Sequence, residues 1–412
     1  MRILLRLCAV LILFFHISAV SIEKRADAAG KKTQLFSDIS PGLSIYRYDW
    51  DLETCVLYIA EISRDEPTLK FEVSLANSEV LGKETVRSMA MRRTQHGDRK
   101  VVVAVNGGFG VLGDMRGYGG VLENIYIQDG ELITQPTDND ACFGVTESGE
   151  FISTPVKMKA TIKIGDHSLA IGCINQRRLD GCQITLYTPR FGDSTHTNRR
   201  RGKEIELSGL KLPISPLYAN NYNVDTVSTN GNSSIPDDGL ILWISSQIKE
   251  PAVSEFKQNA SGTIHVTLDP PEWNDVRHAI GGRIRLLKNG KINQELVDLH
   301  IKNLDKHVPG KRNQFLNLSH EPRTALGYNE DTLYLAVADG RQPKYSTGLT
   351  LYELASILIE LGATEAINLD GGSSSTFVVN DKVVNKPSGQ KEREVLNAVF
   401  ITIDADYSET KK

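Results

Sequence analysis

Residues 366–376 place the tightest constraint on how this chain of 412 residues can fold. The segment begins as a short apolar run, reaches a carboxylate at Asp370, and continues with two glycines and four hydroxyl side chains. The glycines allow a sharp turn and let a ligand approach the main-chain N–H groups. Because Asp-Gly is also ordinary turn chemistry, its meaning depends on the neighbouring segments.

Those neighbouring segments predict a strand, a helix and a second strand. Residues 332–338 are apolar and rich in β-favouring side chains, which is typical of a buried strand. Thr350, with a glutamate three residues later, has the spacing of a capping box, so a helix is expected to start there and to end near Gly362. Residues 366–369 form the next predicted strand. This succession predicts a parallel, right-handed crossover.

The crossover would place two carboxylates at one edge of the sheet. Asp339 follows the first strand and Asp370 follows the second, and open α/β sheets bind ligands at that edge. Residues 150–280 contain β-favouring segments separated by turn residues, and they predict a β-rich lobe. The expected fold class is α+β (mixed α/β), with a mixed sheet, a C-terminal β-α-β unit and a β-rich middle lobe.

A series of short motifs runs through the chain in a definite order. They occupy residues 105–109, 279–282, 322–327, 337–341, 348–354 and 368–376. In this order they resemble the phosphodiester glycosidase family, and the likeness extends loosely over residues 45–403. The resemblance implies a hydrolase that acts on a phosphodiester joined to the anomeric carbon of a sugar.

The implied reaction needs few chemical groups. Cleavage of the sugar C–O bond releases a phosphate ester with a second pKa of about 6, so strong proton donation is not essential. A carboxylate near the anomeric carbon and cationic donors to the phosphate are required. Asp370 is the first candidate for that carboxylate, as nucleophile or as base toward water. Asp339 is the second, with a structural turn residue as the alternative.

The other candidate residues lie in the motif loops or close to them, and they would bind phosphate or sugar or shape the pocket. They are Asn106, Gly107, Gly108, Gly281, Gly282, Arg323, Thr324, Arg341, Gly371, Gly372, Ser373, Ser374, Ser375, Thr376 and Arg393. Simpler explanations stay open: surface ion pairs for the arginines, a polar strand start for the hydroxyls, and close packing for the glycines. No motif requires a cofactor, although Asp339 and Asp370 could hold a divalent cation.

The first 28 residues predict a cleaved export signal. Arg2 and Arg6 precede an apolar run over residues 7–20, and residues 26–28 have the form of an A-x-A cleavage site. A membrane anchor is the alternative, but the run is short for a bilayer span. We therefore expect a secreted, periplasmic or envelope protein without stable membrane insertion after signal cleavage.

Residues 29–412 are expected to form a single domain. Within it, residues 29–44 are predicted to be a flexible N-terminal segment, and residues 150–280 an inserted lobe. The formal net charge of −4 argues against a general nucleic-acid binder. The sequence does not predict the oligomeric state.

Four cysteines follow the predicted signal: Cys55, Cys142, Cys173 and Cys182. An even number in an exported chain permits two disulfides in three pairings. The Cys173–Cys182 pairing would close a short loop and is favoured, with buried free thiols as the alternative. The spacings match no zinc site.

The favoured function is an exported glycosidase that hydrolyses the sugar C1–O bond of sugar-1-phosphodiesters in envelope or exopolysaccharide-type glycans. One alternative is a serine-dependent phosphodiesterase or esterase with Ser374 or a neighbour as nucleophile. It lacks the G-x-S-x-G elbow and a clearly paired histidine. Another alternative is a non-catalytic, glycan-binding envelope protein.

Overall fold

The computed structural model describes residues 30–36, 39–50, 54–111, 120–138, 140–176, 182–197, 201–216, 218–249, 251–304 and 319–405. The predicted export signal, residues 1–28, lies outside the described residues. Within the described part of the chain, no helix is long and apolar enough to cross a bilayer.

Two sheets carry most of the motifs. The central sheet has eight strands in the order β1 (Lys31–Phe36), β2 (Leu43–Trp50), β3 (Cys55–Ser63), β22 (Thr332–Ala338), β21 (Arg323–Tyr328), β23 (Glu365–Asn368), β19 (Ile284–Lys288) and β20 (Lys291–Ile292). The facing sheet has five strands in the order β25 (Lys382–Val383), β24 (Phe377–Val379), β5 (Arg99–Asn106), β26 (Asn397–Asp404) and β4 (Lys70–Leu75).

Two further sheets complete the strand set. The connecting sheet has the order β7 (Glu131–Thr134), β6 (Tyr126–Gln128), β18 (Val276–Gly281), β8 (Cys142–Thr146) and β9 (Phe151–Ile152). The lobe sheet has the order β11 (His167–Ala170), β10 (Lys157–Ile164), β17 (Ser261–Asp269), β15 (Asn220–Ser228), β14 (Gly202–Ser208), β16 (Leu240–Ser245), β13 (Ile184–Tyr187) and β12 (Cys173–Ile174).

The helices within the described residues are short and lie on the outside of the sheets. The α-helices are α2 (Val86–His96), α3 (Ala252–Glu255), α4 (Gln294–Leu304) and α6 (Leu351–Glu360). The 3₁₀ turns are η1 (Ala76–Ser78), η2 (Pro189–Phe191), η3 (Pro271–Asp275) and η4 (Gly372–Ser374). The predicted capping box at the start of α6 is present, because Thr350 accepts from the Glu353 N–H and Glu353 accepts from the Thr350 N–H.

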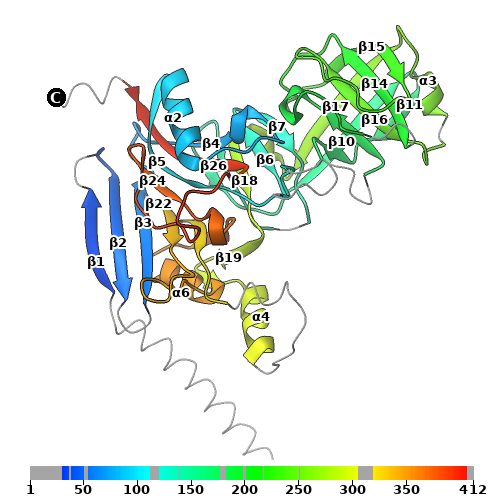
Figure 1. Cartoon of the computed structure of the whole chain (residues 1–412). Coiled ribbons are helices and arrows are strands. Elements are labelled where there is room, and N and C mark those ends of the chain that lie inside the picture. The colour runs from blue at the N-terminus through cyan, green and yellow to red at the C-terminus, as the bar shows by residue number, and fades with distance from the viewer. Residues whose placement is uncertain are drawn as a thin grey trace, which may run out of the picture.

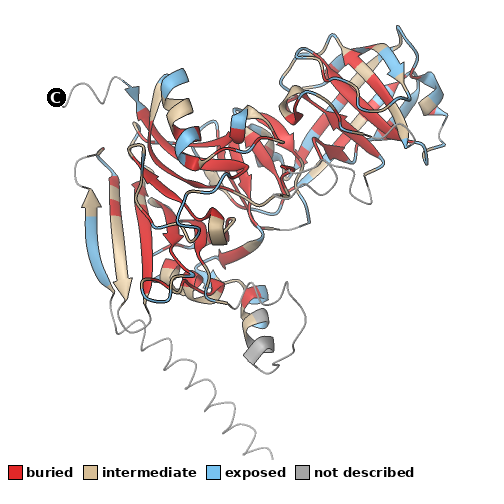
Figure 2. Cartoon of the chain, in the orientation of Figure 1, coloured by how far each residue is buried: buried red, intermediate tan, exposed pale blue. Residues whose placement is uncertain are grey.

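The inner strands of the central and facing sheets, such as β22 and β5, bury both of their faces. In β22, Leu335 and Val337 point into the core between the two sheets, whereas Ala336 packs under α6. In β5, Val103 and Val105 enter the same core, while Ala104 packs under α2. This alternation follows the two-residue period of a strand. The order of layers is therefore α6, central sheet, facing sheet and α2 (Figures 1 and 2).

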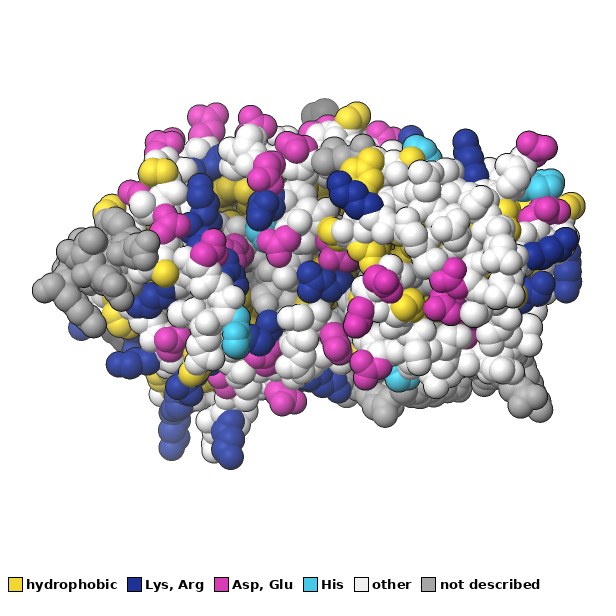
Figure 3. Space-filling view, turned by 90° about the horizontal axis from the view of Figure 1, so that it is seen from above, with side chains coloured by type: hydrophobic (Ala, Val, Ile, Leu, Met, Phe, Trp, Pro, Cys, Tyr) yellow, Lys and Arg dark blue, Asp and Glu magenta, His cyan; other side chains and the backbone are white. Residues whose placement is uncertain are grey.

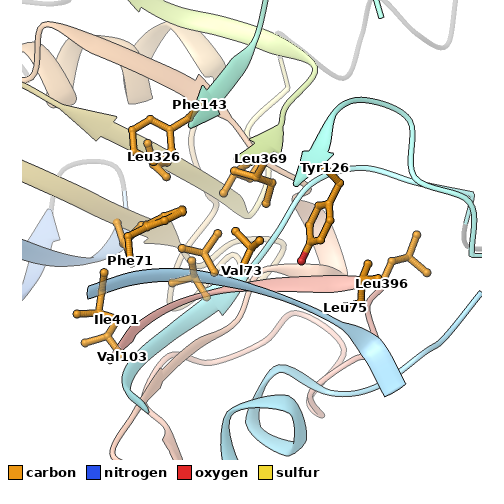
Figure 4. Close-up of a cluster of buried hydrophobic side chains, with 14 of the residues drawn as sticks. Phe71, Val73, Leu75, Val103, Tyr126, Phe143, Leu326, Leu369, Leu396 and Ile401 are labelled. Carbon is orange, nitrogen blue, oxygen red and sulfur yellow. The ribbon is translucent and has the colours of Figure 1, made fainter. Parts of the chain in front are cut away.

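The core between the sheets is built from aromatic and branched side chains of several sheets. Leu326 comes from the central sheet, Val103 and Ile401 come from the facing sheet, and Phe143 comes from the connecting sheet (Figure 4). Leu369, one residue before Asp370, is fully buried in the same cluster. The segment that leads into the predicted site is thus anchored by apolar packing.

The predicted α+β class is wrong, because strands account for 46% of the structure and helices for 14%. Continuous apolar runs such as residues 101–105 form strands that are buried on both faces. In β5 and β22, a helix covers one face and the other sheet covers the second face. β22 and β23 do run in the same direction with α6 between them, but each pairs antiparallel with β21, which lies between them.

The N-terminal segment also differs from its prediction. Residues 29–44 were expected to be flexible, yet Lys31–Phe36 forms strand β1, paired antiparallel with β2. Main-chain hydrogen bonds along β2 hold this segment as the edge strand of the central sheet.

The lobe sheet spans residues 157–269 and projects from the rest of the molecule (Figure 1). It has its own apolar core, which includes Ile162, Leu186 and Leu242. A Cys173–Cys182 disulfide lies at one edge and confirms the favoured pairing, whereas Cys55 and Cys142 are buried and take no part in this disulfide. This sheet falls within the predicted inserted lobe, although the division into domains remains a prediction.

Candidate functional site

Main-chain hydrogen bonds bring the separate motifs together at the end of β23. The Asp370 N–H donates to the Gly107 carbonyl (3.0 Å), and the Gly372 N–H donates to the Pro322 carbonyl (2.8 Å). The Arg283 N–H also donates to the Asn368 carbonyl (3.2 Å). Loops far apart in the sequence therefore meet around residues 368–372.

The motif glycines allow these loops to approach one another. A Cβ at Gly108 would lie 2.4 Å from the Gly281 carbonyl oxygen, and one at Gly282 would lie 2.3 Å from the Asn368 carbonyl oxygen. Both distances are closer than a side chain tolerates, so glycine is required by packing. Gly107, Gly281 and Gly371 are crowded in the same way by Asn397, Asn124 and Pro322. Gly372 has φ +62°, a left-handed conformation that favours glycine.

Asn106 is the hydrogen-bonding centre of this meeting point. Its amide nitrogen donates to the Asp370 carbonyl (2.6 Å). Its amide oxygen accepts from the Thr324 hydroxyl (2.8 Å) and the Thr376 N–H (3.1 Å). The side chain is fully buried. Asn106 and Thr324 thus hold the Asp370 loop in place from two sides.

Asp370 is a partly exposed residue whose carboxylate accepts a hydrogen bond from the Gly371 N–H (2.9 Å). Burial raises the pKa of this carboxyl above its ordinary value. The Ser374 hydroxyl, the Gly371 N–H and the charges of Arg393 and Arg283 act in the opposite direction and lower the pKa. The Ser374 hydroxyl lies close enough for this effect, but its buried oxygen makes no hydrogen bond of normal geometry within the described residues.

The four predicted hydroxyl groups divide between surface and interior. Ser373 is partly exposed, and its hydroxyl oxygen accepts from Arg341 Nη1 (3.3 Å) and from the Ser388 hydroxyl (3.4 Å). Ser374, Ser375 and Thr376 are buried. The Thr376 hydroxyl donates to the Ser374 carbonyl (3.1 Å), so this part of the run turns inward.

The predicted arginines lie in three different settings. Arg323 is 6% exposed and donates to the carbonyls of Leu349 (2.9 Å) and Ser319 (2.8 Å), and burial lowers the pKa of its guanidinium to about 10. Arg341 is exposed and donates through Nε to Glu321 (2.5 Å). Arg393 is exposed, and its charge acts on Asp370. Arg341 and Arg393 are therefore the accessible cations of the predicted set.

Asp339 lies at the end of β22 but is only 1% exposed. Its carboxylate accepts from the Tyr345 hydroxyl, the Asn385 amide and the Lys386 N–H. Burial raises the pKa of this carboxyl, and the three donors oppose the rise. The structure therefore places Asp339 beneath the surface at which Asp370 emerges.

Several residues of this region were not among the predicted set. Asn368 has a buried amide oxygen without a hydrogen-bond partner in the described part of the chain. Arg283 donates twice to Glu123 (2.9 and 2.8 Å) and stacks 4.5 Å above the Phe109 ring. Asn368 is the first residue of the last motif and Arg283 directly follows the motif at residues 279–282, so both could have been included on that basis. Asn385, by contrast, had no sequence signal, because its contacts depend on the folded loop.

The molecular surface gives two further facts about the surroundings. Lysine and arginine side chains are interspersed with aspartate and glutamate over the face seen in Figure 3, so this face has no uniform charge. Hollows of about 390 and 320 Å³ lie beside α2 and on the β15–β17 surface, not at Asp370.

Among the described residues, no three His, Cys, Asp or Glu side chains gather as a metal site. The expectation that no cofactor is needed stays a prediction.

Comparison with known proteins bears directly on the motifs. Residues 218–402 match the family model described as phosphodiester glycosidase. The resemblance to the phosphodiester glycosidase family is thereby confirmed. The matched part contains β23, Asp339 and the whole Asp370 loop.

Two relatives and a solved structure are similar to this chain over different parts of its length. The mouse N-acetylglucosamine-1-phosphodiester alpha-N-acetylglucosaminidase is 36% identical over 177 residues, which are 40% of this chain and 32% of that protein. A Bacillus subtilis (strain 168) protein, the SPbeta prophage-derived uncharacterized protein YomE, is 36% identical over 97 residues, which are 23% of this chain and 15% of that protein. The crystal structure of a hypothetical protein from Synechocystis shares the fold, with TM-score 0.69, 16% identity, and coverage of 91% of this chain and 64% of that one. The alignments thus span less than a third of either relative.

Proposed function

We propose that this protein is a phosphodiester glycosidase that hydrolyses the sugar C1–O bond of sugar-1-phosphodiesters. The observation that carries the proposal is Asp370, a partly exposed residue held where the motif loops meet. In the proposed reaction, water adds to the sugar carbon C1, the C1–O bond breaks, and the phosphate oxygen keeps the bonding electrons. The products are the free sugar and a phosphomonoester.

Asp370 acts at the anomeric carbon in this proposal. Its negative charge stabilises the positive charge that develops there, either by forming a covalent intermediate or by activating water. Exposed Arg341 and Arg393 are the cations that meet the phosphate, and the planar guanidinium group suits its oxygens. Because the phosphate leaves readily as an anion, the reaction proceeds without an exposed second carboxyl group as general acid.

The serine-dependent alternative gains no support from the geometry. The Ser374 hydroxyl is fully buried and, in the described part of the chain, makes no hydrogen bond to a histidine that could activate it. Ser374 instead lies beside Asp370 and favours its ionised form.

Hydrolysis of a panel of sugar-1-phosphodiesters in ¹⁸O-labelled water tests the proposal. Label in the released sugar, together with loss of turnover in Asp370→Asn, is the expected result. Label in the phosphate would indicate P–O cleavage and would overturn the proposal. Binding of the panel without turnover would indicate a non-catalytic glycan-binding protein.

We further propose that the chain is exported and acts on envelope or exopolysaccharide-type glycans. The basic start, apolar run and A-x-A site at residues 1–28 support export. The Cys173–Cys182 disulfide also favours an oxidising compartment outside the cytoplasm. N-terminal sequencing of protein from the native cell envelope should find a mature chain that begins near Ala29. An intact Met1 on cytoplasmic protein would contradict this proposal.

A further inference from the structure

The carboxylate of Asp339 is saturated by hydrogen bonds from within the protein. Oδ2 accepts from the Tyr345 hydroxyl (3.0 Å) and from the Lys386 N–H (2.9 Å). Oδ1 accepts from the Asn385 amide (2.8 Å). Since the residue is only 1% exposed, its oxygens have no access to a substrate that lies at the surface.

The donors to Asp339 belong to two loops that rest on the candidate site. Residues 385–388 form the first loop. Asn385 donates to the Ser375 carbonyl (3.1 Å) and accepts from the Phe377 N–H (2.8 Å), and Ser388 donates to the Ser373 hydroxyl (3.4 Å). This loop therefore lies against the hydroxyl run that follows Asp370.

Residues 340–347 form the second loop. Its two sides are joined through Gln342 and Ser346, and the Ser346 hydroxyl donates to the Asp339 carbonyl (2.6 Å). Gln342 also donates to the Lys386 carbonyl (2.9 Å), which ties the two loops to each other. Arg341, at the start of this loop, reaches Ser373 on the neighbouring segment.

We infer that Asp339 is a positioning residue whose carboxylate clamps these two loops together and so holds Arg341 and Ser373 beside the Asp370 loop. The role in catalysis rests on the function proposed above. The clamp requires the ionised form, because a protonated oxygen would present a hydrogen where the Lys386 N–H or the Asn385 amide already donates. This inference gives Asp339 a different role from the second catalytic carboxylate that its sequence position suggested.

Asp339→Asn in the full chain is the direct test, because the amide keeps the shape but places an N–H₂ group against a donor. Hydrogen exchange at residues 385–388 should accelerate by about 10-fold or more, the factor that the loss of one charge-assisted hydrogen bond carries. KM for a sugar-1-phosphodiester should rise by a similar factor, with kcat within about threefold of the wild-type value. The pH–rate profile should keep its acid limb, which belongs to Asp370.

Two further variants keep the test decisive. Tyr345→Phe removes one of the hydrogen bonds to the same carboxylate and leaves its charge in place, so it should give a smaller change of the same kind. It also serves if Asp339→Asn fails to fold. Asp331→Asn, on the exposed turn before β22, makes the same chemical change at the surface and should alter neither exchange nor kinetics.

The outcomes separate the inference from the proposed function. Unchanged exchange at residues 385–388 in Asp339→Asn would overturn the clamp, whatever the activity. Normal exchange with a large loss of kcat and of a pH limb would make Asp339 a catalytic residue. If no sugar phosphodiester is turned over, the proposed function fails, but faster exchange in Asp339→Asn and Tyr345→Phe would still support the clamp.

Discussion

Asp370 combines partial exposure with a pKa above that of an ordinary aspartate, and the two properties make it testable in isolation. The amide of Asp370→Asn can still accept the hydrogen bond from the Gly371 N–H, so the loop is expected to keep its shape. Removal of the charge should lower kcat by at least about 10²-fold. Steady-state kinetics on the best substrate of the panel measure the loss. If Asp370→Asn keeps more than about a tenth of the wild-type turnover, the loss is smaller than predicted, and Asp370 is not the catalytic carboxylate.

The same substitution has a predicted effect on stability. A folded-state pKa above the unfolded value means that the folded protein binds the proton more tightly, so stability falls as pH rises through the raised pKa. Asp370→Asn lacks this loss. At pH 7 the variant should therefore unfold at the same or a higher temperature than the wild type, and the gain should vanish below pH of about 4. Thermal unfolding of both proteins at several pH values measures this gain. If the variant is more stable than the wild type at pH 4 and less stable than it at pH 7, the predicted effect of the raised pKa is wrong.

The pH dependence of activity follows from the same carboxyl group. Because the ionised form is required, kcat/KM should fall as pH drops, at a pH above the ordinary range of aspartate. Ser374→Ala removes a hydroxyl that favours the ionised form, so the acid limb should move to still higher pH. A pH–rate profile of both proteins measures the shift, and a limb that moves down would be inconsistent with this arrangement.

Two arginines of the predicted set should respond differently to lysine. Arg323→Lys removes a buried planar fork that bonds two carbonyls, so it should destabilise the fold by about 1–3 kcal/mol. Arg341→Lys should leave stability nearly unchanged and weaken binding of a phosphodiester more than of the free sugar. Denaturant unfolding measures the stability of the two variants, and calorimetry measures their binding of the phosphodiester and of the free sugar. Equal effects of the two variants on binding would show that Arg323 also contacts the ligand.

At the scale of elements, local patterns predicted the strand–helix–strand order well. Thr350 begins α6 with its capping box, and the strands on either side of the helix lie close to their predicted positions. The sequence did not show that β21 lies between the two strands, because the sequence of an apolar strand does not indicate which strand pairs with it. It also could not show whether a helix or another sheet covers each face. The fold class was wrong for that reason.

For the site, too, the sequence predicted what depends on local segments and did not predict what depends on contacts between loops. Motif glycines and Asn106 were found because they stand in recognisable segments, and the structure brings them to the Asp370 loop. The buried settings of Arg323 and Asp339 could not be predicted, since they depend on carbonyl and amide partners from other loops. Residue type identified the groups, whereas exposure decides which of them can meet a ligand.

Close packing of the motif loops predicts a strong response to a single methyl group. In Gly282→Ala, the new Cβ would lie 2.3 Å from the Asn368 carbonyl oxygen, so the loops must separate. We expect lower thermal stability and loss of activity, with a cost of about 1–3 kcal/mol for overpacking. Gly389→Ala, at an exposed position where a Cβ meets only an ordinary contact of 3.7 Å, is the matched control. A fully active Gly282→Ala would show that the loops need not touch.

At the scale of the whole molecule, the state of the cysteines can be tested by counting how many react with an alkylating reagent. The disulfide joins Cys173 to Cys182, and Cys55 and Cys142 lie outside it. Alkylation of the purified protein in denaturant should label two cysteines before reduction and four after it. A fifth labelled cysteine would be Cys8, and it would show that the predicted signal is still attached.

The hydrogen bond from Asn106 to Asp370 spans 264 positions of the chain. β26, which pairs with β5 on one side and β4 on the other, is contributed by residues 397–404. Contacts of such long range form late, because the intervening chain must first lose its freedom. A ribosome-bound chain that lacks these last strands therefore has no assembled site. On the function proposed above, hydrolysis of sugar-1-phosphodiesters would begin only after synthesis and folding are almost complete, so an unfinished chain would spare such molecules in the compartment where it is made.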